Sequence, residues 1–435
     1  MMTSFYSGLT GLSAYANALN IVGNNLANIN TTAFKASTMN FEDLVTNTFG
    51  GIATSGNGNP MQIGLGALPN SISGIFTQGS IQNTSESTNV AVEGNGFFIV
   101  GDSTDEQFYT RAGNFAFNRE GYLVNPSGKY VLGYTDRDTA GKLIPSGPLN
   151  QIFMPSNTIS DPSASTNVQT FVNLNVNAPF DNLATPAIDE AEHYLSSVTI
   201  YDSKGAPHTL TFEYVHQDPA LNGGVDTWAY TASIPDSETV TGAAGSGTLG
   251  TGNIQFDGTG TMIVPAADVA FTTLAFSNGA NPLNFNWDLY DENLVPAITG
   301  YPLPSSTNST NANGYPPGTL TSLIIDNDGI IQGVFSNGQV EDLAQLATAS
   351  FNNSKGLLRL GRNLYAETNA SGNAAIGAPG TGGRGNILGG ALEASNVDIA
   401  QQFTDMIIFE RGYQANSRII TTSDEVIQQA LSLKR

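Results

Sequence analysis

Two terminal segments decide the fold, and residues 5–26 show the first: FYSGLTGLSAYANALNIVGNNL. Apolar or small residues recur there in alternating steps of four and three, which is the spacing of a coiled-coil seam. The members of this stripe are Phe5, Leu9, Leu12, Ala16, Leu19, Gly23 and Leu26. The pattern predicts an amphipathic helix over residues 4–28.

A matching stripe at the carboxyl end predicts a second helix over residues 396–433. Its members are Ile399, Phe403, Met406, Glu410, Tyr413, Ser417, Ile420, Asp424, Ile427 and Leu431. Ser395 and Asn396 are candidate N-caps, and Asp398 is expected in the first turn, where the helix dipole favours an anion. Either helix could pack on a domain of its own, but neither adjoins another helical segment. We therefore expect the two ends to pair with each other and with copies from other subunits.

The interior, roughly residues 35–390, is typical of short strands separated by turns. Asn327-Asp328-Gly329 and Asn337-Gly338 are hairpin-type turn signals, and Ser203-Lys204-Gly205 separates two further strand patterns. We expect antiparallel sheets arranged as sandwiches or barrels. The fold class is thus mainly β, with nested β domains between α-helical termini that pair as a coiled coil.

Composition narrows the possible functions of these 435 residues. The formal net charge of −22 disfavours nucleic acid and anionic membranes as partners. Cys is absent and there are three His, so we expect no disulfide, metal site or cofactor, and no enzymatic activity. His208 is expected to be a solvated strand residue, and Asp326-Asn-Asp-Gly329 a turn rather than a calcium loop. The first 20 residues lack the basic and apolar regions of a cleaved secretion signal, and no run is long enough to insert into a membrane.

Composition shifts along the chain suggest a nested domain order. Between Lys204 and Lys355 there is no Lys or Arg, which fits an acidic module inserted into another domain. The expected parts are a terminal helical domain (1–30 and 391–435), a connecting region (31–75 and 376–390), an inner β domain (76–175 and 315–375) and an inserted outer β domain (176–314).

Both ends resemble the bacterial flagellar rod and hook axial family. The two matching blocks are SGLTGLSAYANALNIVGNNLANINTTAFK (7–35) and GALEASNVDIAQQFTDMIIFERGYQANSRIITTSDEVIQQALSLK (390–434). Within this family, TIYDSKGAPHTLTFEYV (199–215) is similar to the outer domain of hook proteins, whereas rod proteins lack that insert. Ala33 stands where the family usually has Gly, so the turn there either uses an ordinary φ or carries strain.

The resemblance implies a structural subunit of the flagellar hook, a flexible helical tube that transmits torque from rod to filament. It implies partners of several kinds: other copies of this chain, the distal rod protein, the hook cap and hook–filament junction proteins, and the flagellar type III export apparatus. The implied location is the hook, outside the cell. A distal rod protein remains an alternative, and a secreted acidic β-rich binding module is a more remote one.

Contacts between subunits are expected along both stripes and in the polar segments that follow or precede them. The expected residues are Phe5, Leu9, Leu12, Leu19, Asn24, Asn25, Leu26, Asn28, Thr31, Phe34, Glu393, Asn396, Val397, Ile399, Phe403, Met406, Tyr413, Asn416, Ile420, Ile427 and Leu431. Burying the apolar members of the carboxyl-terminal stripe would stabilise by about 1.5–3 kcal/mol each, comparable in total with the entropy lost on ordering the helix. We therefore expect a lone terminus to order only when neighbouring subunits add contacts.

Overall fold

The computed structural model describes residues 2–49, 61–102, 106–139, 141–155, 157–180, 193–240, 242, 245–291 and 293–432. Parts of all four expected domains lie outside these ranges. They are residues 1 and 433–435 of the terminal domain, 50–60 of the connecting region, 103–105, 140 and 156 of the inner β domain, and 181–192, 241, 243–244 and 292 of the inserted domain.

The two terminal helices are confirmed as α1 (Met2–Ala27) and α2 (Ile399–Ser432). The start of α2 corrects the expected caps. Asp398 caps it: the Asp398 Oδ1 atom accepts a hydrogen bond from Gln401 N at 3.1 Å, and Asp398 O accepts one from Gln402 N. Ser395 and Asn396 lie before the helix. Asn396 does not cap it, because its side-chain amide bonds the backbone of Ala36 and Ile75. Neither described helix is long and apolar enough to cross a membrane.

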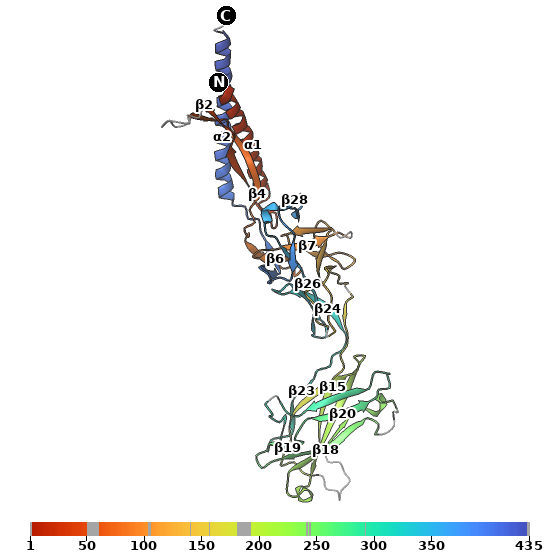
Figure 1. The fold of residues 1–435 in the computed structure, drawn as a ribbon. Coiled ribbons are helices and arrows are strands. Elements are labelled where there is room, and N and C mark those ends of the chain that lie inside the picture. Colours follow the sequence, from red (N-terminus) through yellow and green to blue (C-terminus); the bar gives the residue numbers. More distant parts are fainter. Residues whose placement is uncertain are drawn as a thin grey trace, which may run out of the picture. The chain divides into compact units, whose positions relative to one another are not determined.

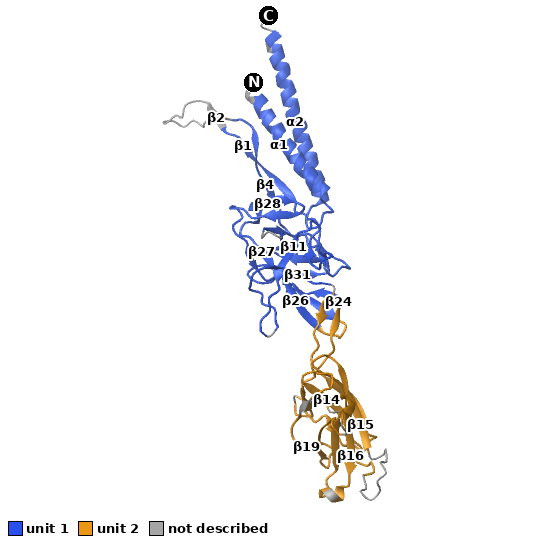
Figure 2. Ribbon diagram, turned by 90° about the vertical axis from the view of Figure 1, so that its right-hand side faces the viewer, with its two compact units in different colours: residues 1–156, 322–334, 340–435 blue, residues 157–321, 335–339 orange. Residues whose placement is uncertain are grey.

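The chain divides into two compact units (Figure 2). Unit 1 contains residues 1–156, 322–334 and 340–435, and unit 2 contains residues 157–321 and 335–339. Unit 2 is strongly acidic, since its sequence has 16 Asp and Glu residues against Lys204 alone.

A large sheet forms the centre of unit 1. Its main strands are β7 (Phe97–Gly101), β8 (Gln107–Thr110), β11 (Tyr130–Tyr134), β24 (Gly318–Ile325), β25 (Ile330–Phe335), β26 (Val340–Leu346), β28 (Leu358–Gly361) and β29 (Leu364–Ala366). Short strands join it: β9 (Ala116–Phe117), β10 (Leu123–Val124), β12 (Asn150–Gln151), β27 (Thr348–Ser350) and β30 (Ala375–Gly377). The first residues of β24 belong to unit 2 and pair there with β13 (Ile159–Ser160). A short 3-10 turn, η3 (Ser354–Gly356), precedes β28.

Strand β7 lies at the centre of the unit 1 core, because both of its faces are buried. Phe98 and Val100 belong to one hydrophobic cluster, and Phe97 and Ile99 belong to another. Side chains alternate between the faces of a strand, so the continuous apolar run of β7 serves two cores at once.

Four two-stranded pairings complete unit 1. They are β1 (Ser37–Asp43) with β4 (Ala67–Gly74), β2 (Thr46–Phe49) with β3 (Met61–Gly64), β5 (Ile81–Asn83) with β32 (Ala391–Glu393), and β6 (Val90–Glu93) with β31 (Asn386–Gly389). The last two pairings join the segment after the helix α1 to the segment before the helix α2. The two ends of the chain are therefore brought together in the body of the unit as well as in the helices.

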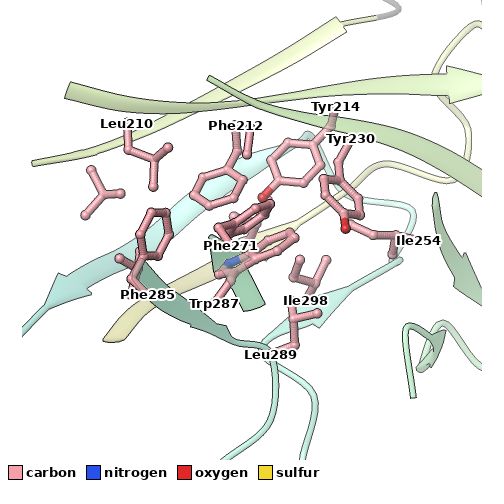
Figure 3. Packing of buried hydrophobic residues seen from close by; sticks show 14 of the residues in the cluster. Leu210, Phe212, Tyr214, Tyr230, Ile254, Phe271, Phe285, Trp287, Leu289 and Ile298 are labelled. Carbon is pink, nitrogen blue, oxygen red and sulfur yellow. The ribbon is translucent and has the colours of Figure 1, made fainter. Parts of the chain in front are cut away.

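Unit 2 is a sandwich of two five-stranded sheets. One sheet contains β15 (His193–Tyr201), β16 (Pro207–Gln217), β17 (Thr227–Ser233), β18 (Thr248–Phe256) and β19 (Met262–Val264). The other contains β14 (Asn167–Asn173), β20 (Val269–Leu274), β21 (Leu283–Asp288), β22 (Ile298–Thr299) and β23 (Ser306–Ala312). Two short 3-10 turns, η1 (Pro219–Asn222) and η2 (Asp236–Glu238), lie in its loops. Aromatic side chains from both sheets fill the space between them, including Phe212, Tyr230, Phe271 and Trp287 (Figure 3).

The second sheet of this sandwich differs from the expected antiparallel arrangement. Strand β14 pairs in parallel with β21 and β22, and antiparallel only with β23. Parallel neighbours need a long crossover, and here all of the first sheet lies between β14 and β21 in the sequence. Local turn signals cannot reveal such a pairing.

The predicted hairpin turns are confirmed. Gly329 and Gly338 have φ angles of 71° and 81° between the strands that they join, and Asp326 Oδ1 accepts a hydrogen bond from Ile330 N. The expectation for His208 is wrong: its side chain is buried on the inner face of β16, stacked on Phe276 and bonded to two carboxylates.

Candidate assembly interface

Small residues hold α1 and α2 together as an antiparallel pair (Figure 1). A Cβ atom added at Gly11 would lie 2.7 Å from Asn416 Oδ1, and one added at Gly412 would lie 2.6 Å from the Tyr15 ring. At Gly8 the approach is less close, and an added Cβ atom would lie 3.3 Å from Ile419 and 3.4 Å from Ile420. Glycine at these positions lets the two backbones approach more closely than larger side chains would permit.

The face of α1 that packs on α2 is not the predicted stripe. Its members are Gly8, Gly11, Tyr15, Ala18, Val22 and Asn25, each one residue before a predicted member. One residue turns a helix by about 100°. Consequently Phe5, Leu12, Leu19 and Leu26 are only partly buried, and Leu9 is exposed. Within the chain, the closest packing thus uses small side chains next to the stripe, and the contacts of the stripe with other subunits stay a prediction.

The predicted residues of α2 fall into two groups. Met406, Asn416 and Ile420 are partly buried, and Ile420 contacts Gly8 of α1. The exposed group is Ile399, Phe403, Tyr413, Ile427 and Leu431. Four exposed apolar residues that the stripe did not predict lie between them in sequence: Ile407, Ile408, Ile419 and Val426. No side chain described in α2 is fully buried, so this helix is covered along only one side.

The carboxyl-terminal end of α2 extends beyond α1 within unit 1 (Figures 1 and 2). Asn25 bonds Gln402, Tyr15 contacts Gly412 and Gly8 contacts Ile420, so the first residue of α1 lies opposite about residue 426 at equal rise along the two helices. Ile427 continues the stripe one heptad after Ile420. Its side chain is 36 % exposed and that of Leu431 is 65 % exposed, because α1 has ended there.

A buried ion cluster lies directly below the helices. Lys35 Nζ is 2.6 Å from Glu393 Oε1, and Arg111 Nη1 is 3.7 Å from Glu393 Oε2. The side chains of Lys35 and Glu393 are completely buried, and that of Arg111 nearly so. Burial lowers the pKa of Lys35 and of Arg111, and in both cases the nearby Glu393 carboxylate opposes that effect. One carboxylate is therefore shared by two cations that come from distant parts of the sequence, and the cluster keeps a net charge of +1.

Further hydrogen bonds clamp the segment after α1 to the segment before α2. Asn396 accepts from Ala36 N through Oδ1 at 2.8 Å and donates through Nδ2 to the carbonyl oxygens of Ile75 and Thr77. Arg359 donates to Lys35 O at 2.9 Å and to the Ser37 hydroxyl. Arg359 and Arg111 were missed at the sequence level, and the one available signal was that basic residues are rare in this chain.

The Asn-rich end of α1 is used mainly within the chain. Asn25 is buried, and its amide bonds both backbone groups of Ser37 and the side chain of Gln402. Asn28 donates to Asn24 O, which satisfies a carbonyl at the helix end, and accepts from the Thr31 hydroxyl. Because Asn25 and Glu393 are buried here, any part that they play in assembly is indirect, through placing the helices.

The remaining predicted residues lie around this clamp. Phe34 is partly buried, and the guanidinium carbon of Arg359 lies 5.9 Å from the centre of the Phe34 ring. Val397 is partly buried just before the start of α2. Tyr15, Phe41 and Phe409 form a cluster of rings from α1, β1 and α2, with centres 5.4–6.2 Å apart. The ribbon of β1 and β4 is thereby packed on both helices.

Ala33 has a φ of 54° and is almost completely buried, so the ordinary-φ alternative for this turn is wrong. Its N–H donates to Glu393 O at 2.8 Å, which holds the turn in the left-handed region. Ala33→Val is expected to lower the free energy of unfolding by more than about 2 kcal/mol, because a β-branched side chain is strained there and overpacks the site. Ala33→Gly is expected to stay within about 1 kcal/mol, since relief of the strain offsets the lost methyl contact. Urea denaturation measures both, and a Val variant as stable as the parent chain would contradict this account.

The comparisons with known proteins cover the whole chain. Family models match in four places: Flagella basal body rod protein (residues 5–35), Flagellar hook protein FlgE/F/G D1 domain (91–172), Flagellar basal body protein FlaE D2 domain (173–315), and Flagellar basal body rod FlgEFG protein C-terminal (388–433). The Flagellar hook protein FlgE of Treponema pallidum is 36% identical over 100% of both chains, and that of Borreliella burgdorferi is 34% identical over 100% of both.

This chain belongs to the flagellar hook protein family. Its membership rests on full-length similarity and not on the termini alone. A crystal structure of Helicobacter pylori flagellar hook protein FlgE2 is 19% identical, with a TM-score of 0.48 over 70% of this chain and 98% of that chain. The D2 domain match of this hook family member lies within unit 2, and the two rod-type matches coincide with α1 and α2 and the segments beside them.

Proposed function

We propose that this chain is the structural subunit of a flagellar hook and that it polymerises through its terminal helices into a flexible tube that transmits torque. Relatives that are named flagellar hook proteins are similar to this chain over the full length of both sequences. The observation that carries the assembly mechanism is that α1 and α2 cover each other along one side only. Large apolar side chains remain exposed on both helices: Tyr6, Leu9, Ile399, Phe403, Ile407, Ile408, Tyr413, Ile419, Val426, Ile427 and Leu431.

An exposed apolar set of this size costs free energy in water unless another surface covers it. A second copy of the same helix pair supplies such a surface. Contacts between different faces of identical subunits generate open helical assemblies when the rotation does not close. A tube built from this chain is therefore consistent with the geometry of the helices and with the family.

Different parts of the chain have different proposed roles in the tube. Residues 1–30 and 391–435 form the assembly domain, and the predicted stripe residues of α1 and the exposed residues of α2 make contacts between subunits. The acidic insert would remain free to move against its copies, since like charges keep contacts between them weak. The distal rod, the hook cap, the junction proteins and the export apparatus are proposed partners of the assembly.

Removing either terminal helix is expected to abolish tube formation and to leave unit 2 folded. Chains lacking residues 2–27 or residues 399–432 lose one half of the helix pair, so the remaining helix has no partner to hold it and the joint surface of the pair is not formed. Electron microscopy and sedimentation measure polymer, and near-ultraviolet circular dichroism reports the two Trp residues, both buried in unit 2. Tubes formed by either truncated chain would contradict the proposal.

Limited proteolysis of the full chain separates order in the monomer from order in the polymer. We expect cleavage in α2 of the free subunit to be at least tenfold faster than in tubes, because none of its described side chains is fully buried before assembly. Cleavage in unit 2 serves as the control and should not change by that factor.

A further inference from the structure

His216 lies at one end of the buried face of β16, in the acidic unit 2. Inward-facing positions alternate along this strand as His208, Leu210, Phe212, Tyr214 and His216. The His216 ring stacks on Trp228 of the neighbouring strand, with ring centres 4.6 Å apart and planes 10° apart. A histidine so deeply buried against an indole has a fixed orientation, so the partners of both ring nitrogens are defined.

Both ring nitrogens of His216 face groups that can only accept a hydrogen bond. Nδ1 is 2.9 Å from the carbonyl oxygen of Ala178, and Nε2 is 2.8 Å from Asp226 Oδ1. A neutral imidazole has one N–H and can satisfy one of these acceptors, whereas an imidazolium donates to both. The arrangement therefore requires the charged ring.

The partner on the Nδ1 side belongs to the connection between the two sheets. Residues 174–180 follow β14 of one sheet, on the way to β15 of the other, and Ala178 lies among them. Its described part is also held by the core residue Leu174, whose N–H donates to Thr299 O, and by a bond from Asn175 N to the Ser305 hydroxyl. Asn177 N and Ala178 N bond only back to Asn175, and Ala178 packs on the edge of the core. The bond to His216 ties this segment to the strand β16.

We propose that His216 is a pH-operated latch whose imidazolium form holds residues 175–180 against β16, and whose deprotonation releases that segment. On losing one proton the ring keeps its charge-assisted bond to Asp226, which is the stronger of the two. The bare Nδ1 atom then faces the Ala178 oxygen with a lone pair and repels it. Deprotonation therefore breaks the bond to the Ala178 carbonyl and keeps the bond to Asp226.

The electrostatic surroundings support this direction. Burial alone would lower the pKa of His216, but the Asp226 carboxylate and the carbonyl groups of Ala178 and Pro179 raise it above its usual value near 6.5. Among the described residues, Asp226 is the one charged group that acts on the ring; its other neighbours are Trp228 and Phe180. Because the folded pKa is raised, the latch is fully closed below pH about 6.5 and is lost as the pH rises through the folded value.

The three histidines of this chain make the titration directly observable. We would label the full-length monomer with ¹³C-histidine and follow the ring signals from pH 5 to pH 9, with amide hydrogen exchange of residues 174–180 corrected for intrinsic rates. The His216 signal is expected to titrate above pH 6.5. Protection of the 174–180 amides is expected to fall on the order of tenfold over the same pH range, which corresponds to the loss of one hydrogen bond.

Three variants sharpen the test. Asp226→Asn removes the carboxylate charge that stabilises the imidazolium form of His216. The ring is then expected to lose its proton at lower pH, with an acid dissociation constant on the order of tenfold larger, and the loss of protection should move to lower pH with it. His216→Gln should show low protection at every pH. His193→Gln is the matched control: His193 bonds Glu213 through one nitrogen at the partly exposed end of β15, and its loss should leave both readouts unchanged.

Two outcomes would overturn the latch. One is a His216 signal that titrates at or below pH 6.5. The other is protection of residues 174–180 that does not follow the His216 titration in the parent chain and in Asp226→Asn. Neither readout depends on polymerisation, so the latch and the proposed hook assembly can fail separately.

Discussion

Glu393→Gln is expected to be the most damaging single substitution at the base of the terminal helices, with a loss of about 3–5 kcal/mol in the stability of that region. The Glu393 carboxylate is the anion that contacts both Lys35 and Arg111, and all three side chains are buried. A neutral amide keeps the shape but leaves two cations without a counter-charge. Hydrogen exchange at Ala33 and Gly79, whose N–H groups bond Glu393, measures the loss locally.

Two controls separate this effect from a general loss of ion pairing. Lys35→Met removes one of the two cations and leaves Arg111 paired with Glu393, so the net charge of the cluster falls from +1 to zero and the expected loss is smaller. Asp102→Asn breaks the Lys129–Asp102 pair, which has the same 2.6 Å separation as Lys35–Glu393 but is exposed to water. That change is expected to cost less than about 1 kcal/mol. Equal losses in Glu393→Gln and Asp102→Asn would show that burial of the cluster is unimportant.

Replacing Ile427 and Leu431 together by Ser is expected to raise the critical concentration for tube formation on the order of 100-fold. Each buried side chain of this size is worth about 1.5–3 kcal/mol, and about 1.4 kcal/mol changes an association constant tenfold. Both residues lie on the part of α2 that extends beyond α1. The free subunit should therefore be unaffected, which thermal unfolding of the monomer checks.

Two comparison variants define what this result means. Leu431→Met keeps the apolar character and should polymerise nearly as well as the parent chain. Ile420→Ala is one heptad before Ile427 but faces Gly8 of α1, so it should loosen the helix pair in the monomer itself. Normal assembly of the double Ser variant would show that the end of α2 is not a contact between subunits.

The sequence was most informative where local patterns carry the structure. The steps of four and three predicted both terminal helices, and the Asp-Gly and Asn-Gly signals predicted the hairpins around Gly329 and Gly338, because such signals depend on a few neighbouring residues. The same rules failed at the start of α2. Asn396 is a good N-cap by type, but the tertiary structure uses its amide to join Ala36, Ile75 and Thr77.

Partners distant in sequence explain the other corrections. His208 has no acceptor at a regular spacing that sequence inspection could recognise, yet the fold places Asp202 and Glu238 on its two nitrogens. The parallel pairing of β14 with β21 likewise joins segments more than a hundred residues apart. The energy of such contacts depends on which surfaces meet, and no local pattern contains that information.

Sequence alone determined that this chain has paired helical ends, a β-rich acidic interior and the signature of the flagellar axial family, because periodicity, turn chemistry and net charge are properties of the residues themselves. Tertiary structure alone decided which face of α1 packs on α2. Close approach of two helices selects Gly and Ala at the contact and turns Leu9, Leu12 and Leu19 away from it. It also brought Lys35, Arg111 and Glu393 into one buried cluster, since only the folded chain can bring residues hundreds of positions apart within bonding distance.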